Sequence, residues 1–348
     1  MAQVLSAAET ANYLNVRHDW LARHKEPILE PELPIVDPHH HLWDRATGRY
    51  LLDDLLADTN SGHNILATVF VQARAMLRAD GPDEMKPVGE VEFVNGVAAM
   101  TASGIYGNIR ACAGIVGHAD MMLGGRVEPV LEALERAGGG RFRGIRHIVA
   151  YDADPQVMNP GNPAWPGMLA DPKFREGVKT LARMGYSFDC WLYCPQMDEL
   201  TALADAIPEC KIVLNHCGGA VGINAYRKDE VFPVWKKSIE ALAQRPNVFV
   251  KLGGLGMRLC GHEFDKLADP PSSQVLADTW RPYIETCIAA FGPSRGMFES
   301  NFPVDKGSYS YPVFWNACKI LAKGASAAEK ADLFFGTAKR FYRLDAIG

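Results

Sequence analysis

The first apolar run of the chain leads into the stretch Leu33-Pro34-Ile35-Val36-Asp37-Pro38-His39-His40-His41-Leu42-Trp43-Asp44, which is its most informative segment. Because successive side chains of a strand point to opposite faces, His39 and His41 would project together and His40 the other way. Two neutral imidazoles at a strand end form half of a site for zinc, iron or manganese. The stretch therefore predicts a buried strand that ends at a metal site.

The composition is that of a globular protein without a basic surface. The chain has 348 residues, of which 48% are hydrophobic and 22% charged, and its formal net charge is −5. This balance argues against nucleic acid as a partner. No run of about 18 apolar residues is present, so we expect no membrane-spanning helix. The eight cysteines include no Cys-x-x-Cys pair, which favours reduced thiols and a cytoplasmic location.

Short apolar runs alternate with helical stretches along the chain. Several of these runs are continuous and β-branched, which is typical of parallel strands buried on both faces. Eight strands that alternate with helices favour a (β/α)8 TIM barrel, an α/β fold, over a doubly wound sheet. The expected strands are Ile35–Pro38, Leu66–Gln72, Ile109–Val116, Gly144–Val149, Tyr186–Leu192, Lys211–Asn215, Val248–Leu252 and Gly296–Glu299.

The barrel is expected to follow a separate N-terminal element. Ser6-Ala7-Ala8-Glu9 has the form of a capping box and predicts a helix that continues to about Lys25. We therefore predict a helical extension over residues 1–32 and a single barrel domain over residues 33–348. Two long loops, Ala150–Pro172 and Gly254–Ser273, follow strands and would shape a pocket on the C-terminal face.

Polar residues gather where the predicted strands end. His39 and His41 end the first strand, His216 follows the sixth, and the turn Asn301–Asp305 follows the eighth. Strands one and eight are neighbours in a barrel, so these groups can converge on one face. Further polar residues expected near strand ends are Gln72, His118, Arg143, Arg146, His147 and Glu299.

This convergence is typical of a mononuclear metal hydrolase. Such a metal takes three protein ligands and a water, whose pKa it lowers toward neutrality. A carboxylate then accepts the proton as the hydroxide attacks a carbonyl carbon. Arg146, together with Arg143, could hold a substrate carboxylate by bidentate contacts.

Several ordered motifs resemble the amidohydrolase superfamily, in particular the amidohydrolase-related branch that contains sugar-acid lactonases and pyrone-dicarboxylate lactonase. The resemblance covers about residues 35–344. Its motifs are Val36–Asp44, Val69–Gln72, Phe142–Arg146, Asn215–Gly219, Val250–Gly254, Ser300–Pro303 and Phe335–Tyr342.

The resemblance implies a distorted TIM barrel with a metal at its C-terminal mouth, although some members of the branch work without metal. His39 and His41 match the family's His-x-His pair, His216 matches the histidine of strand six, and Arg146 matches a position near the substrate. Zinc is the favoured metal, with iron or manganese as alternatives.

The turn after strand eight departs from the family pattern. Hydrolytic relatives usually carry Asp where this chain has Asn301, and Gly where it has Glu299. An amide cannot act as a general base, because it does not ionise in the useful pH range. Asn301 can still bind a metal through its oxygen, and Asp305 or Glu299 can supply the base.

Other outcomes of this departure stay open. His40, His118 and His147 could complete a second metal site with Glu299 or Asp305, as in a non-haem iron or manganese oxygenase. A decarboxylase and a catalytically silent barrel are further alternatives.

We predict a cytoplasmic hydrolase of a small carboxylated lactone or a related cyclic ester or amide. His39, His41 and His216 would hold the metal, Asp305 would accept the proton beside Asn301, and Arg146 would bind the substrate. Arg143 and Gln72 are expected to assist in binding. The expected partner is a small molecule, with neither nucleic acid nor a membrane, and a homo-oligomer stays open.

Overall fold

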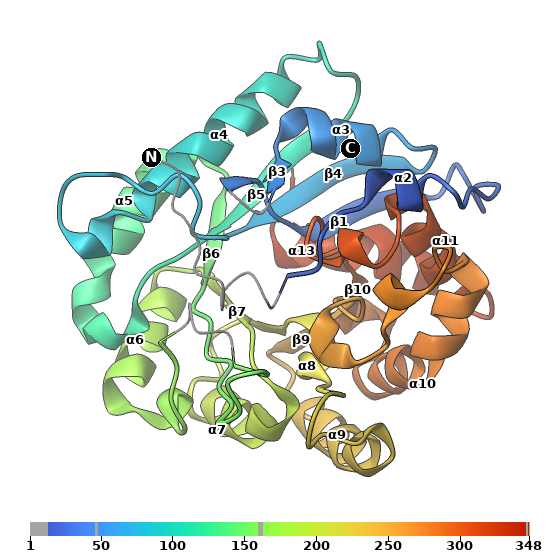
Figure 1. The fold of residues 1–348 in the computed structure, drawn as a ribbon. Coiled ribbons are helices and arrows are strands. Elements are labelled where there is room, and N and C mark those ends of the chain that lie inside the picture. Colours follow the sequence, from blue (N-terminus) through green and yellow to red (C-terminus); the bar gives the residue numbers. More distant parts are fainter. Residues whose placement is uncertain (1–12, 46–47, 159–162, 346, 348) are drawn as a thin grey trace.

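A computed structural model of the chain describes residues 13–45, 48–158, 163–345 and 347. Eight parallel strands form one sheet in the order β1-β4-β5-β6-β7-β8-β9-β10, and Figure 1 shows helices arranged around them. The strands are β1 Pro34–His40, β4 Asn64–Val71, β5 Arg110–Gly117, β6 Phe142–Arg146, β7 Ser187–Cys190, β8 Ile212–Leu214, β9 Val248–Leu252 and β10 Gly296–Phe298.

The sheet closes into a barrel between its first and last strands. Just beyond β10, Phe302 forms a parallel bridge with His40, and the His41 N–H donates to the Phe302 carbonyl oxygen at 2.8 Å. The Asn301 N–H donates to the His39 carbonyl oxygen at 2.9 Å. The predicted (β/α)8 TIM barrel is therefore confirmed, and all eight predicted strands are present.

Helices follow the strands and cover the barrel. Their apolar faces pack on strands that are almost fully buried, as expected when a parallel sheet is covered. No helix of the described residues is long and apolar enough to cross a membrane. The helices are α2 His18–Leu21, α3 Leu52–Thr59, α4 Val88–Ala102, α5 Glu128–Gly138, α6 Pro172–Arg183, α7 Met197–Ala206, α8 His216–Gly219, α9 Lys228–Leu242, α10 Ser273–Phe291, α11 Tyr311–Leu321, α12 Ala327–Ala331 and α13 Thr337–Phe341.

The segment before β1 differs from the predicted helix Ser6–Lys25. Its first part, to residue 12, lies outside the described residues. Residues 13–17 are not helical, and α2 is a single turn. Trp20 instead donates its indole N–H to the carbonyl oxygens of Leu267 and Ala268, at 3.2 and 3.1 Å. Such tertiary contacts override a weak local preference for helix.

A short antiparallel hairpin, β2 Trp43–Arg45 and β3 Gly48–Tyr50, follows β1 and was not predicted from the sequence. It places Trp43 beside the end of β1, where the Trp43 ring stacks on His41 with centroids 5.7 Å apart. The hairpin thus forms part of the wall around the C-terminal mouth of the barrel.

Candidate metal centre and active site

Two histidines and one carboxylate meet at the C-terminal ends of the strands. His39 comes from β1, His216 follows β8, and Glu299 follows β10. Their ligand atoms all lie within 4.8 Å of one another, and all three residues are buried. Glu299 Oε1 lies 2.7 Å from His216 Nδ1, and Glu299 Oε2 lies 2.7 Å from His39 Nδ1.

Two glycines after β9 make room for this cluster. A Cβ on Gly254 would lie 2.4 Å from His216 Nδ1, and a Cβ on Gly253 would lie 2.1 Å from the Glu299 carbonyl oxygen. Both distances are far shorter than van der Waals contact, so no side chain fits at either position. His216 itself has a left-handed φ of 54°, and its N–H donates to Glu299 Oε1 at 3.0 Å. Gly253 and Gly254 therefore allow His216 and Glu299, which are far from them in sequence, to lie side by side.

The imidazoles of the cluster are held in their neutral form. Burial lowers the pKa of His39 and of His216 well below the usual range, and the nearby Lys251 and Arg146 act in the same direction. A neutral imidazole keeps a lone pair for a metal ion. His39 and His216 are thus prepared as ligands.

The predicted third histidine lies next to the cluster and not within it. The rings of His39 and His41 are 4.9 Å apart at nearly right angles. His41 Nδ1 donates to the Val71 carbonyl oxygen at 2.7 Å, which leaves its other ring nitrogen for further contacts. Glu299, which we expected only at a second metal site or as a base, stands instead with His39 and His216.

The donor set of this cluster fits a divalent metal. Within the described part of the chain, the buried Glu299 Oε2 makes no hydrogen bond, although it lies 2.7 Å from His39 Nδ1. A buried carboxylate oxygen without a hydrogen bond costs free energy that a bound cation would offset. Two imidazoles and one carboxylate suit zinc, iron and manganese.

Two buried cations flank the cluster. Arg146 Nη1 lies 3.2 Å from His39 Nε2, and Lys251 Nζ lies 3.2 Å from His39 Nδ1. Lys251 is paired with Asp189 at 2.8 Å, and Asp189 also accepts a hydrogen bond of 2.9 Å from the Tyr342 hydroxyl. The Asp189 carboxylate thus compensates the buried charge of Lys251.

Arg146 keeps binding capacity of its own. One of its terminal nitrogens donates to the Gln72 carbonyl oxygen and the other faces His39, while its Nε has no partner among the described residues. The side-chain oxygen of Gln72 is likewise buried and without a partner in that part of the chain. Such groups are expected where a ligand binds.

The turn after β10 holds a second buried carboxylate. Asp305 accepts hydrogen bonds from Asn301 Nδ2 at 2.8 Å, from the Gly256 N–H at 2.9 Å and from the Tyr309 hydroxyl at 2.5 Å. Burial nevertheless raises the pKa of Asp305 to about 7. Asn301, which has a left-handed φ of 56°, holds the Asp305 carboxylate near the end of β10 through this hydrogen bond.

Four predicted residues lie elsewhere. Arg143 stands near the N-terminal end of β6, where it donates to the carbonyl oxygens of Gly140 and Phe142. The His40 ring points away from His39 and makes a 2.8 Å hydrogen bond with Thr68. His118 and His147 form a separate pair with ring centroids 5.4 Å apart.

The alternative of a second metal site is therefore not assembled among the described residues. His118 Nδ1 donates to the Arg146 carbonyl oxygen at 3.1 Å, and His147 Nδ1 accepts the Met121 N–H at 3.1 Å. Among the described residues, the group of His39, His216 and Glu299 is the only cluster of potential ligands. His40 cannot join such a site, because alternation along β1 turns its ring to the opposite face of the strand.

Sequence reasoning also missed several buried groups of the site. Glu90, in the first turn of α4, accepts hydrogen bonds of 2.8 Å from the N–H groups of Ala73 and Ala75, and so fixes the loop after Gln72. Tyr309 and Tyr342 hold Asp305 and Asp189. Lys251 and Asp189, by contrast, were not missed: charges inside otherwise apolar strands suggest that Asp189 pairs with Lys251 or Arg146, and the structure shows the pair with Lys251.

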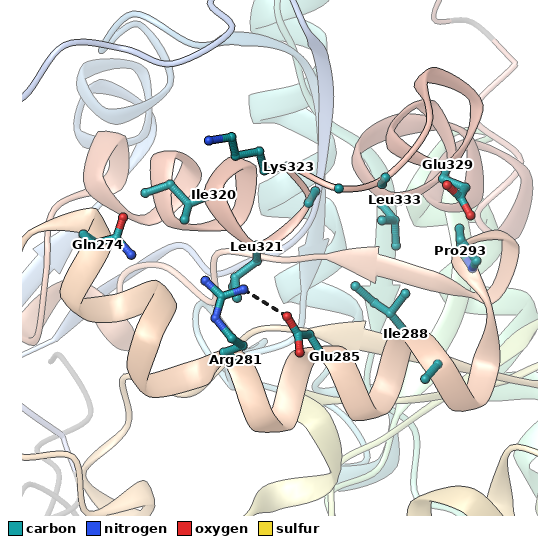
Figure 2. Close-up of a pocket in the computed structure, with 14 residues that line it drawn as sticks. Gln274, Arg281, Glu285, Ile288, Pro293, Ile320, Leu321, Lys323, Glu329 and Leu333 are labelled. Carbon is teal, nitrogen blue, oxygen red and sulfur yellow. Dashed lines mark hydrogen bonds and ion pairs between the residues drawn. The ribbon is translucent and has the colours of Figure 1, made fainter.

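An open cavity of about 900 Å³ lies elsewhere, among the outer helices α10, α11 and α12 (Figure 2). Its charged residues include Arg281 and Glu285, an exposed pair one turn apart on α10, 2.9 Å from each other. It is remote from the strand ends where barrel active sites form.

Comparison with known proteins agrees with this architecture. The amidohydrolase family model matches residues 36–344. An uncharacterised protein, y4mH of Sinorhizobium fredii (strain NBRC 101917 / NGR234), is 34% identical over 336 residues, which cover 90% of this chain and 99% of the relative. The L-fucono-1,5-lactonase of Burkholderia multivorans (strain ATCC 17616 / 249) is 26% identical over 327 residues, 89% of this chain and 96% of the relative.

Solved structures give the same picture. A crystal structure of an amidohydrolase from Burkholderia multivorans with bound zinc has a TM-score of 0.69 at 26% identity, over 90% of this chain and 99% of that chain. A 2-pyrone-4,6-dicarboxylic acid hydrolase from Pseudomonas putida, at 18% identity and a TM-score of 0.57, shares the fold over 90% of this chain and 98% of its own. Barrel, strand-end cluster and family match agree, and the chain therefore belongs to the amidohydrolase family of hydrolytic enzymes.

Proposed function

We propose that this protein hydrolyses a small lactone, preferably a carboxylated one, in the cytoplasm. The observation that carries the proposal is the convergence of His39, His216 and Glu299 at the mouth of an amidohydrolase barrel. The similarity to an L-fucono-1,5-lactonase supports a cyclic ester as the substrate. The eight buried cysteines, none of which is paired, agree with a reducing compartment.

His39, His216 and Glu299 would hold a divalent metal, for which zinc is our first choice, and His41 would lie beside it. When bound, such a metal supplies Lewis-acid chemistry and an activated water. Burial keeps both imidazoles neutral. The two glycines after β9 keep the space around His216 and Glu299 free of side chains.

Asp305 is the proposed proton acceptor. A general base works best when its pKa is near the operating pH, and burial brings the pKa of Asp305 to about 7. Its three hydrogen bonds leave one of about four acceptor positions of the carboxylate for an incoming proton. Asn301 would orient this carboxylate through its amide N–H.

Arg146 would bind the substrate carboxylate through its free Nε and an adjacent terminal nitrogen. Side-on contacts of this kind give two parallel charge-assisted hydrogen bonds. The free side-chain oxygen of Gln72 would accept a hydrogen bond from a substrate hydroxyl. Arg143 takes no part in this proposal, because it lies near the opposite end of β6.

A direct test measures acid release from a carboxylated and a neutral lactone, 2-pyrone-4,6-dicarboxylate and L-fucono-1,5-lactone. Wild-type protein is assayed after purification, after chelation and after addition of zinc, iron or manganese. We expect hydrolysis that the Glu299→Gln variant lacks. Oxygen consumption or release of carbon dioxide in place of ring opening would contradict the proposal and favour an oxygenase or a decarboxylase.

A further inference from the structure

A buried carboxylate that has no role in the chemistry described above lies at the seam between the first and last strands of the barrel. Asp37, in β1, is fully buried, and its Oδ1 accepts the Ser300 N–H at 3.0 Å and the His39 N–H at 3.3 Å. Its Oδ2 accepts the Ser300 hydroxyl at 2.6 Å and the Tyr311 hydroxyl at 3.0 Å. Donors of the chain thus occupy the roughly four acceptor positions of this carboxylate.

These contacts connect the two sides of the metal centre. Ser300 directly follows Glu299, and His39 is two residues beyond Asp37. Between these two backbone segments, Glu299 Oε2 and His39 Nδ1 lie 2.7 Å apart. One carboxylate therefore joins the two strand ends that carry two of the three proposed metal ligands.

The backbone of β1 is irregular at this point. Asp37 lies opposite Thr68 of β4. His40 lies opposite Phe70, so β1 has one residue more than β4 over this stretch, which forms a β-bulge. Bulges next to active sites re-aim side chains and leave a residue out of the strand ladder. Asp37 accepts the His39 N–H inside this bulge, so the direction of the His39 side chain depends on the Asp37 carboxylate.

We propose that Asp37 is a positioning residue of the metal centre, which holds His39 and Glu299 at the separation that a metal ion requires. The proposal rests on the proposed function for the metal centre, but not for the substrate. Replacing an outer residue that orients metal ligands typically lowers metal affinity about ten- to a hundredfold. Asp37 would act in this way through the backbone of both ligands, without touching metal or substrate.

The test compares Ser300→Ala with Tyr311→Phe in the full chain. The two variants are matched, because each removes one buried hydroxyl that donates to the same oxygen, Asp37 Oδ2. Only Ser300 lies next to Glu299, whereas Tyr311 begins α11. Co²⁺ is the metal probe, because zinc has a filled d shell and no visible absorption bands. The readouts are Co²⁺ affinity in competition with a chelator, the visible spectrum of bound Co²⁺, and the urea midpoint of the metal-free protein.

For Ser300→Ala we expect the affinity for Co²⁺ to fall about tenfold and the visible bands to shift, because the ligands move apart. Tyr311→Phe should also lower the urea midpoint, but it should keep the affinity within about twofold of wild type and leave the spectrum unchanged. Asp37→Asn should lose affinity as Ser300→Ala does. The double variant should lose no more than the weaker of the two, because both changes remove one contact.

Equal changes of affinity in Ser300→Ala and Tyr311→Phe, or an unchanged affinity in Ser300→Ala, would overturn the proposal. Additive losses in the double variant, or a wild type that binds no Co²⁺, would do the same. If Asp37→Asn does not fold, the comparison of Ser300→Ala with Tyr311→Phe still decides. If affinity and spectrum change as expected but no lactone is hydrolysed, the positioning role stands and the proposed function fails.

Discussion

Replacing Asp305 with Asn should separate its role in catalysis from its role in the fold. The variant has nearly the same shape and cannot accept a proton at neutral pH. The amide of Asp305→Asn can present its oxygen to the Gly256 N–H and the Tyr309 hydroxyl. Its NH2 group then faces Asn301, whose own amide can rotate to accept. All three hydrogen bonds of Asp305 thus have a replacement.

The effect on stability follows from the pKa of Asp305. Burial raises this pKa from 3.8 to about 7, a difference of about three units, so burying the ionised form costs at most about 4 kcal/mol. Because the pKa is higher in the folded protein, the favourable contribution of Asp305 is fully present below the unfolded pKa. It is lost as the pH rises through about 7.

Turnover of Asp305→Asn should therefore fall at least about a hundredfold, as expected when a general base is lost. In urea titrations, the free energy of unfolding of the variant should rise relative to that of wild type between about pH 5 and about pH 8. Asp53→Asn is the control, because its side chain is 83% exposed. Near-normal turnover would remove Asp305 from the mechanism. A difference in stability between variant and wild type that is the same at both pH values would refute the burial argument.

Three further outcomes are expected. Glu299→Gln should lower bound metal, measured after dialysis, at least about tenfold, because a charged ligand is lost; metal content equal to wild type would exclude Glu299 as a ligand. Arg146→Lys should raise KM for a carboxylated lactone about tenfold, since an ammonium cannot make side-on bidentate contacts, whereas an unchanged KM would place the carboxylate elsewhere. Lys306→Met should lower the free energy of unfolding by about 3 kcal/mol in urea titrations, because Lys306 pairs with the buried Asp58 at 2.7 Å; a change within about 0.5 kcal/mol would contradict this.

The barrel could be predicted because buried parallel strands leave a simple pattern. The run Val248–Leu252 has the same bounds in the sequence prediction and in the structure. The meeting of His39 and His216 was predictable for a related reason, since the C-terminal ends of all barrel strands face one mouth. Strand alternation also correctly separated His40 from His39.

The position of Glu299 beside His39 and His216 could not be derived in the same way. Its approach to His216 depends on the space left by Gly253 and Gly254, which follow another strand, β9. The position of Tyr13 and Leu14 was equally hidden, because a local helix preference says nothing of the contacts of Tyr13 with Trp43 or of Leu14 with Gly307. Both positions depend on side-chain contacts between segments that are far apart in the sequence.

Element-resolved metal analysis of protein purified without added metal or chelator tests the central claim most directly. The account predicts about one zinc per chain, held by His39, His216 and Glu299 and absent from Glu299→Gln. Iron or manganese approaching about two per chain would contradict it and would point to an oxygenase with a second site.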